Sequence, residues 1–176
     1  KSSGVSIEVK ESRVENLNKS TDEGLSIRTL RDGRMGFSYT FDHSRDAVER
    51  AVQTALDIGE LMPVDPLNEL PSFEEAHFPK VETYDSAGFD AALDGKIALA
   101  KELEATTLRF DARIKRVRKA GLDQSAGETA LMDTSGRVLR HGVTFFAAYV
   151  TCVAEHGESA EMGSDARYSN FFGSLE

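Results

Sequence analysis

The stretch Gly24–Asp65, GLSIRTLRDGRMGFSYTFDHSRDAVERAVQTALDIGELMPVD, carries the clearest structural pattern of the chain. Its first part holds two alternating runs, Leu25–Leu30 and Met35–Phe41, and each is typical of a half-buried strand. Asp32-Gly33 lies between them and supplies residues that tolerate a positive φ, as a two-residue hairpin turn requires. The stretch therefore predicts a β-hairpin at its start.

The second part of the same stretch predicts a helix. Ser44 is a good N-cap, and Asp46 in the first turn complements the helix dipole. The helix ends near Leu61, because Pro63 follows at once. The helix is expected to carry one apolar stripe at helical spacing: Val48, Val52, Ala55, Leu56 and Gly59.

The second strand of the hairpin has two unlike faces. One face holds the large side chains Met35, Phe37, Tyr39 and Phe41. The other holds Gly36, Ser38 and Thr40, which are small enough to let another element approach closely.

Outside this stretch the pattern alternates between strands, a connector and one more helix. Strands are predicted at Val5–Lys10 and Arg13–Lys19, and residues 62–84, which hold all four prolines, predict an extended connector. Asp85-Ser86 is expected to cap a second helix, whose stripe is Phe89, Leu93, Ile97, Ala100 and Leu103. The remaining candidate strands are Arg113–Asp123, Glu128–Asp133, Arg137–Arg140, Thr144–Glu155 and Glu158–Asp165.

These elements predict an α+β fold, with mixed, largely antiparallel sheets and two main helices packed on one face. The strand, turn and aromatic strand around Leu30–Arg34 are echoed around Leu131–Arg137, which suggests an internal duplication of a β-rich unit. Three segments are predicted: a sheet-and-helix unit at 1–66, an acidic connector at 67–85 and a helix-plus-strands unit at 86–176. Together they are expected to form one compact region, and because the chain opens at Lys1 without Met, we expect it to be part of a longer protein whose start lies upstream.

Composition narrows the class of protein. The chain has 176 residues, 40% of them apolar and 29% charged, which is typical of a globular domain. The net charge of −9 disfavours direct binding to nucleic acid. The single cysteine, Cys152, excludes an intrachain disulfide and suits a reducing compartment, so we expect a cytoplasmic protein with no membrane segment.

No residue pattern identifies a catalytic, cofactor-binding or metal site. His43, His77, His141 and His156 form no i, i+4 pair, and no His-Glu dipeptide occurs, so HExxH-like zinc motifs are absent. Cys152 lies in an apolar strand, which favours an inert buried thiol over a nucleophile. The sequence also lacks a G-x-S-x-G elbow and a phosphate-binding G-x-x-x-x-G-K-[ST] loop.

Two charged groups leave alternatives open. The run Arg109–Lys119, RFDARIKRVRK, is interpreted first as a solvated strand edge, then as an ion-pairing surface for an acidic partner, and last as a nucleic-acid contact. Glu155, Glu158 and Glu161 surround a predicted turn near His156. Acid–base catalysis there is conceivable, although charged turn residues are commoner.

The order of these motifs resembles one family, the TldD/PmbA proteins. The resemblance is carried by Gly24–Ser44, Ala51–Pro71, Asp111–Ser125 and Leu131–Val138, and it spans nearly the whole chain. The "D-P…L-P" exit of the first helix is more similar to the PmbA branch, also called TldE, than to the TldD branch. Each motif is structural, so the specificity comes from their order.

The resemblance implies the N-terminal half of a PmbA-type subunit in a complex that processes small or unfolded peptides. TldD-like members carry an HExxxH zinc motif in their other half, and PmbA-like members lack it. No position of this chain matches the motif, so zinc would belong to a TldD-type partner, and whether the chain's own protein is an enzyme stays open. A TldD-like subunit or a second copy is the expected partner, and a peptide is the expected substrate.

Two other functions compete with this one. The chain could be a protein- or peptide-binding module with no proteolytic role, since an exposed strand such as Met35–Phe41 can accept an extended peptide. The older family label, modulator of DNA gyrase, suggests the other. The negative net charge argues against direct DNA contact in that role.

Overall fold

A computed structural model of the chain describes residues 1–70 and 79–175. The chain forms two compact units. One consists of residues 1–22 and 82–176, and the other of residues 23–81. The two units are described separately below as the sheet unit and the hairpin unit.

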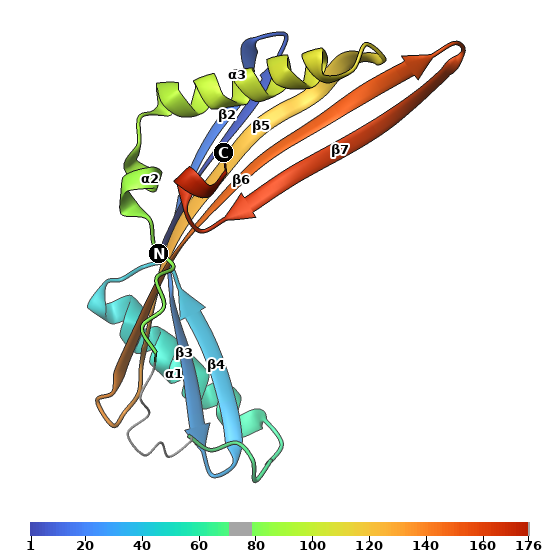
Figure 1. Ribbon diagram of the computed structural model, residues 1–176. Coiled ribbons are helices and arrows are strands. Elements are labelled where there is room, and N and C mark those ends of the chain that lie inside the picture. Colours follow the sequence, from blue (N-terminus) through green and yellow to red (C-terminus); the bar gives the residue numbers. More distant parts are fainter. Residues whose placement is uncertain (71–78, 176) are drawn as a thin grey trace. The chain divides into compact units, whose positions relative to one another are not determined.

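The sheet unit is built on five antiparallel strands in the order β2-β1-β5-β6-β7 (Figure 1). The first 22 residues supply two of them, and β1 pairs along β5 from Ser2 with Gly127 to Val9 with Ala120. The bounds of these strands are β1 Ser2–Lys10, β2 Arg13–Asp22, β5 Ile114–Met132, β6 Val138–His156 and β7 Ser159–Ser169.

The long strands β5 and β6 correct the sequence prediction. Two separate strands were expected in each of these regions, but each is one continuous strand of 19 residues. Gly127 and Gly142, which lie in the gaps between the predicted strands, are both within the paired β5–β6 ladder. Both glycines keep their pairing across this ladder, so the strands continue through them although glycine weakens a strand interior.

Helices cover one face of this sheet, where the core lies. Helix α3 (Leu93–Phe110) packs on β1, β5 and β6, and a short 3₁₀ turn, η1 (Phe172–Ser174), lies beside α2 (Ser86–Asp90). The core consists of fully or almost fully buried apolar side chains from the strands, α3 and the C-terminal end: Ile7, Val9, Ala100, Leu122, Phe146 and Leu175.

The second predicted helix is divided in two. Asp85 caps α2 as expected, because its Oδ1 accepts a hydrogen bond from the Gly88 backbone N–H at 2.8 Å. Ala91 and Ala92 then adopt extended ψ angles of 146° and 135°, and α3 begins only at Leu93. The apolar side chains keep their helical spacing across this break. The sequence pattern therefore predicted one continuous helix.

The turn between β1 and β2 shows how the sheet unit holds a strained connection. Glu11 and Ser12 have φ angles of 51° and 59°, which are uncommon for residues other than glycine. Their backbone N–H groups donate to the two carboxylate oxygens of Glu104 on α3, at 2.7 and 2.8 Å. Glu104 is only 3% exposed, so a buried acidic side chain of the helix holds the turn of the sheet.

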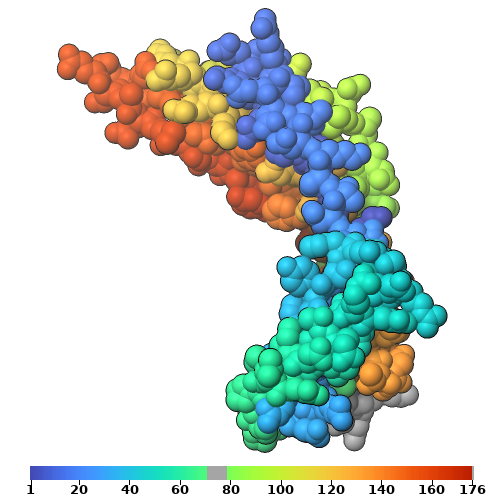
Figure 2. Space-filling view, turned by 180° about the vertical axis from the view of Figure 1, so that it is seen from behind, coloured from blue at the N-terminus to red at the C-terminus, as the bar shows by residue number. Residues whose placement is uncertain are grey.

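The hairpin unit consists of β3 (Leu25–Arg31), β4 (Arg34–Thr40) and α1 (Arg45–Leu61). Asp32 and Gly33 form the predicted turn, with φ angles of 51° and 70°. The Oγ of Ser44 accepts from the Ala47 N–H at 3.4 Å, which confirms the predicted N-cap. Figure 2 views the molecule from behind and shows α1, in cyan to green, over this side of the hairpin.

The buried face of α1 differs from the predicted stripe. The buried residues are Ala47, Ala51, Ala55 and Gly59, whereas Val52 is 38% exposed. The reason is close approach, since a Cβ added at Gly36 of β4 would lie 1.7 Å from the carbonyl oxygen of Ala55. At that separation only small side chains fit between helix and hairpin, and larger apolar residues are displaced to the sides.

The fold class is therefore α+β with antiparallel sheets, as predicted. The boundaries of the two compact units do not coincide with those of the three predicted segments. Residues 1–22 belong to the same sheet as the strands that follow residue 110. Part of the predicted connector, residues 71–78, lies outside the described residues. Among the described residues, no helix is long and apolar enough to span a membrane.

Candidate functional site

The face of the five-stranded sheet opposite α3 carries the main polar constellation of the sheet unit. Strand geometry sends alternate side chains to opposite faces. Ile7 and Leu122 therefore point into the core, while Ser6, Glu8 and Asp123 point to this open face. A register irregularity between Val117 and Lys119 places Val117 in the core and Lys119 beside Glu8.

Five side chains on the open face are joined by hydrogen bonds, and we call them the polar cluster: Ser6, Glu8, Lys119, Asp123 and Tyr149. Ser6 Oγ donates to Asp123 Oδ1 at 2.6 Å. Lys119 Nζ donates to Glu8 Oε1 at 2.8 Å, and the Tyr149 hydroxyl lies 3.4 Å from the same oxygen. The cluster thus joins β1, β5 and β6 across the sheet.

The electrostatics of the polar cluster disfavour acid–base chemistry. Burial, together with the charges of Asp123 and Glu8, raises the pKa of Tyr149 to about 12. The hydrogen bond to Glu8 raises the pKa of Lys119. Both groups are therefore protonated at neutral pH and act as donors, whereas a general base or nucleophile would need a pKa shifted towards neutrality.

A glycine makes room for the tyrosine ring. A Cβ at Gly121 would lie 2.5 Å from Cζ of Tyr149 and 2.7 Å from the carbonyl oxygen of Ile7. Tyr149 can lie across β5 only because this position has no side chain. On the same face Phe145 stacks with Tyr168 of β7, with ring centroids 5.8 Å apart.

Sequence reasoning did not single out the polar cluster. Its members on β1 lie more than 100 residues away from those on β5 and β6, and none belongs to a recognisable motif. The alternation of Ser6 and Glu8 against Ile7 was visible, but only the pairing of β1 with β5 reveals what they face. This pairing joins residues that are far apart in the sequence, so local periodicity cannot predict it.

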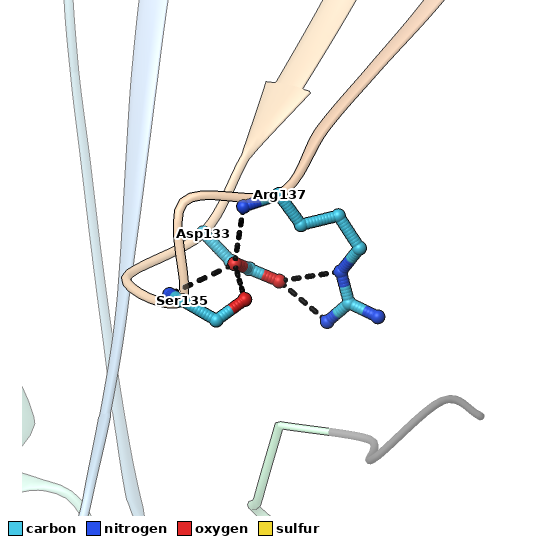
Figure 3. Close-up of polar contacts among 3 residues, drawn as sticks. All are labelled: Asp133, Ser135 and Arg137. Carbon is cyan, nitrogen blue, oxygen red and sulfur yellow. Dashed lines mark hydrogen bonds and ion pairs between the residues drawn. The ribbon is translucent and has the colours of Figure 1, made fainter. Parts of the chain in front are cut away.

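The turn between β5 and β6 holds a second group of polar contacts (Figure 3). The Asp133 carboxylate accepts from the backbone N–H and hydroxyl of Ser135 and from the guanidinium of Arg137, whose Nε lies 2.8 Å away. These bonds lower the pKa of Asp133 to about 2, with Ser135 the largest cause and Arg137 the next. The polar side chains of Asp133, Ser135 and Arg137 thus hydrogen-bond to one another within the turn, and these bonds have a structural role.

The predicted histidine and cysteine positions form no site among the described residues. His43 lies 3.7 Å from Glu23 with both side chains nearly half exposed, and His141 and His156 are exposed residues of β6. His77 lies outside the described residues. Cys152 is a free thiol of intermediate exposure within β6. Within the described ranges, no three His, Cys, Asp or Glu side chains are grouped so that they could hold a metal ion.

The three glutamates near His156 surround the β6–β7 turn, as predicted. Glu158 and Glu161 are exposed. Glu155 lies 3.7 Å from Arg116 of β5, so it forms a cross-strand ion pair. This arrangement matches charged turn residues and brings no general acid–base pair together.

The basic run Arg109–Lys119 is largely neutralised within its own chain. Four of its bases pair with carboxylates: Arg109 with Glu102, Arg113 with Asp111, Arg116 with Glu155 and Lys119 with Glu8. β5 lies inside the sheet, but its pairing with β1 begins only at Ala120, after the run. Internal pairing leaves these bases poorly suited to collect the phosphates of a nucleic acid.

One buried cation has a structural explanation. Lys96 of α3 is 2% exposed, and its Nζ donates to the Phe89 carbonyl oxygen at 2.7 Å. The rings of Phe89 and Phe172 lie 6.0 and 5.7 Å from the ammonium nitrogen, and burial lowers the pKa of Lys96. The residue ties α3 to α2 and η1, which is a packing role.

Comparison with known protein families identifies the family of the chain. Two family models match the chain: PmbA/TldA metallopeptidase domain 1 over residues 1–59, and PmbA/TldA metallopeptidase central domain over residues 88–176. The second match alone covers half of the chain. The chain therefore belongs to the PmbA/TldD metallopeptidase family.

Individual relatives point in the same direction. Metalloprotease PmbA of Escherichia coli O157:H7 is 26% identical over 171 residues, which cover 96% of this chain and 37% of the relative. Metalloprotease PmbA homolog of Haemophilus influenzae is 29% identical over 129 residues, covering 72% of this chain and 28% of the relative. The chain thus spans well under half the length of the curated relatives it matches.

The fold is shared with a solved structure of TldE from Thermococcus kodakarensis. The two superpose with a TM-score of 0.80 at 14% identity, over 95% of this chain and 38% of that one. At such identity the likeness concerns the fold alone. It confirms that the arrangement of strands and helices described above is that of this family.

Proposed function

We propose that this chain forms a non-catalytic part of a PmbA/TldE-type subunit, which works with a TldD-type metallopeptidase on small or unfolded peptides. The observation that carries the proposal is the pair of family domains along the chain, in a structure whose described residues hold no cluster of metal ligands. The relatives named as metalloproteases match this chain over only part of their length. A cytoplasmic location belongs to the same proposal.

The residues that the structure describes do not fit a catalytic zinc ion. Such a site needs three protein ligands, commonly His with Glu or Asp, converging on one point. The described histidines lie apart, and the carboxylates of the polar cluster are engaged by Lys119, Ser6 and Tyr149. No step of peptide hydrolysis is therefore assigned to this chain, and the zinc would belong to the TldD-type partner.

The part left to this chain is that of a rigid support. The sheet unit holds its turns by buried or charge-assisted bonds, and its basic run is neutralised internally. The net charge of −9 favours a role in a protein complex over contact with DNA. A complex of this kind would use the chain for assembly and peptide handling, while the partner performs the chemistry.

The experiment is a reconstitution of peptide hydrolysis. A fluorogenic unfolded peptide is incubated with the chain alone, with a TldD-type protein alone, and with both, each with added zinc and then with a chelator. We expect no turnover by the chain alone, and zinc-dependent turnover only in the samples that hold the TldD-type protein. Turnover by the chain alone that persists after repurification would overturn the proposal.

A further inference from the structure

The outer edge of β4 presents backbone groups that the hairpin does not use. The two-residue turn makes Arg31 and Arg34 a hydrogen-bonded pair, and antiparallel pairs then alternate along the ladder. Met35, Phe37 and Tyr39 consequently fall in non-hydrogen-bonded pairs, so their N–H and C=O groups point away from β3. Among the described residues, β3 is the only strand that pairs with β4.

The same residues present large side chains on the outer face of the hairpin. We call Met35, Phe37, Tyr39 and Phe41 the apolar ladder; their exposed fractions are 40%, 46%, 65% and 73%. Tyr39 and Phe41 contact each other edge to face, with centroids 5.7 Å apart. Three ladder residues thus offer both free backbone groups and apolar surface, which is the combination that strand addition uses.

The hairpin is held in a fixed shape before anything binds. The opposite face is closed by α1, where Thr29 Oγ1 donates to the Ala55 carbonyl oxygen at 3.1 Å. The turn is held by the segment after α1, because the Asp65 N–H donates to the Gly33 carbonyl oxygen at 2.8 Å. A preformed edge loses little conformational entropy when another strand adds to it.

Charge indicates what kind of strand fits. The hairpin holds three arginines and a single aspartate, in a chain whose net charge is −9. Arg34 donates to the carbonyl oxygens of Glu60 and Met62, and Arg31 lies 3.7 Å from Asp32. Arg28 lies directly opposite Phe37 in the register, so it is at the centre of the outer face. A carboxylate on the incoming strand would complement Arg28.

We propose that β4 binds an extended apolar–acidic segment of an unfolded polypeptide as an additional β-strand, with its apolar side chains on the apolar ladder and a carboxylate near Arg28. This site rests on the proposed role in peptide handling and locates it on a particular surface. The site lies in the hairpin unit, whereas the polar cluster belongs to the sheet unit. The site is mainly apolar, and the polar cluster is not. It requires no chemistry from this chain.

Direct binding tests the site separately from hydrolysis. The probe is a fluorescein-labelled octapeptide of alternating valine and glutamate, titrated with the chain while fluorescence anisotropy is recorded. We expect Phe37→Ser combined with Tyr39→Ser to weaken binding on the order of tenfold or more, since exposed aromatics dominate such interfaces. Phe110→Ser is the matched control, because Phe110 is an 84% exposed aromatic at the end of α3. Circular dichroism verifies that each variant is folded.

Backbone and charge variants of the peptide test the binding mode. N-methylation of alternate residues along one edge of the peptide should abolish binding, and methylation along the other edge should leave it unchanged. Lysine in place of glutamate should weaken binding, and Arg28→Glu should reverse that preference. Amide resonances of Met35, Phe37 and Tyr39 should shift on peptide addition.

Three results would overturn the site. The peptide could fail to bind, it could bind equally well to the Phe37→Ser/Tyr39→Ser variant, or both methylation patterns could have the same effect. Concentration-dependent dimers that the same double substitution disperses, with no peptide binding, would show that a second copy covers the ladder. If the unsubstituted chain fails to bind the peptide while partner-dependent hydrolysis is intact, this site is rejected and the proposed function stands.

Discussion

Substitution of Gly36 by alanine tests the central packing contact of the hairpin unit. A Cβ at this position would lie 1.7 Å from the Ala55 carbonyl oxygen and 2.7 Å from Thr29 Oγ1. An ordinary contact is about 3.3 Å, so helix and strand must separate by roughly 1.5 Å. The atom in the way belongs to the backbone of α1, and no side-chain rotation can relieve the clash.

The cost has two parts. Separation breaks the hydrogen bond from Thr29 Oγ1 to the Ala55 carbonyl oxygen, which contributes about 1 kcal/mol. It also strains the row of small buried residues on α1, and overpacking of this kind costs typically about 1–3 kcal/mol. We expect Gly36→Ala to lower the free energy of unfolding of the hairpin unit by about 3 kcal/mol in total.

Native-state amide hydrogen exchange measures this effect in the unit where it occurs. Exchange of α1 and β4 amides should accelerate on the order of a hundredfold, since about 1.4 kcal/mol corresponds to a factor of ten. Gly163→Ala is the control, because Gly163 is also a strand residue and a Cβ there meets nothing within 4 Å. If Gly36→Ala changes the exchange of α1 no more than Gly163→Ala does, the packing argument is wrong.

Three further predictions concern the sheet unit. Glu104→Ala should cost about 2–4 kcal/mol in chemical denaturation, because it removes the acceptor of two backbone N–H groups in a turn with positive φ; an unchanged midpoint would refute this. Since the folded pKa of Asp133 is lowered to about 2, its stabilising effect should be complete above about pH 4 and disappear as the pH falls towards 2, as NMR of the Ser135 amide would show. Asp133→Asn should remove that pH dependence, and a persisting transition would assign it to another group. Asp123→Asn should lower the pKa of Tyr149 from about 12, measured by ultraviolet titration, and an unchanged value would exclude Asp123 as a cause.

Local pattern was sufficient for the hairpin unit because its contacts are close in sequence. The turn at Asp32-Gly33, the cap at Ser44 and the small face of β4 were all predicted and all appear in the structure. The helix stripe was displaced for a reason outside the helix itself. Gly36 permits backbone contact, so Ala51 and Ala55 are buried while Val52 is exposed.

The sheet unit was less predictable because its pairing is long-range. Nothing local indicates that β1 lies between β2 and β5, and the polar cluster depends on that neighbourhood. Because this pairing was not known, β5 and β6 were each predicted as two separate strands. The basic run was weighed as a surface, but its ion-pair partners Glu8 and Glu155 are remote in sequence, so internal neutralisation could not be predicted.

The polar cluster and the edge of β4 differ in the free energy that a binding partner would gain by covering them. In the polar cluster, Glu8 and Asp123 already accept hydrogen bonds from the chain, so covering them removes water without forming a new pair. At the edge of β4, the backbone groups of the apolar ladder would exchange water for a strand partner. The side chains above them would bury apolar surface worth roughly 25 cal/mol per Å². The balance of these terms favours the hairpin as the surface that binds, and the polar cluster as the brace that keeps β1, β5 and β6 in register.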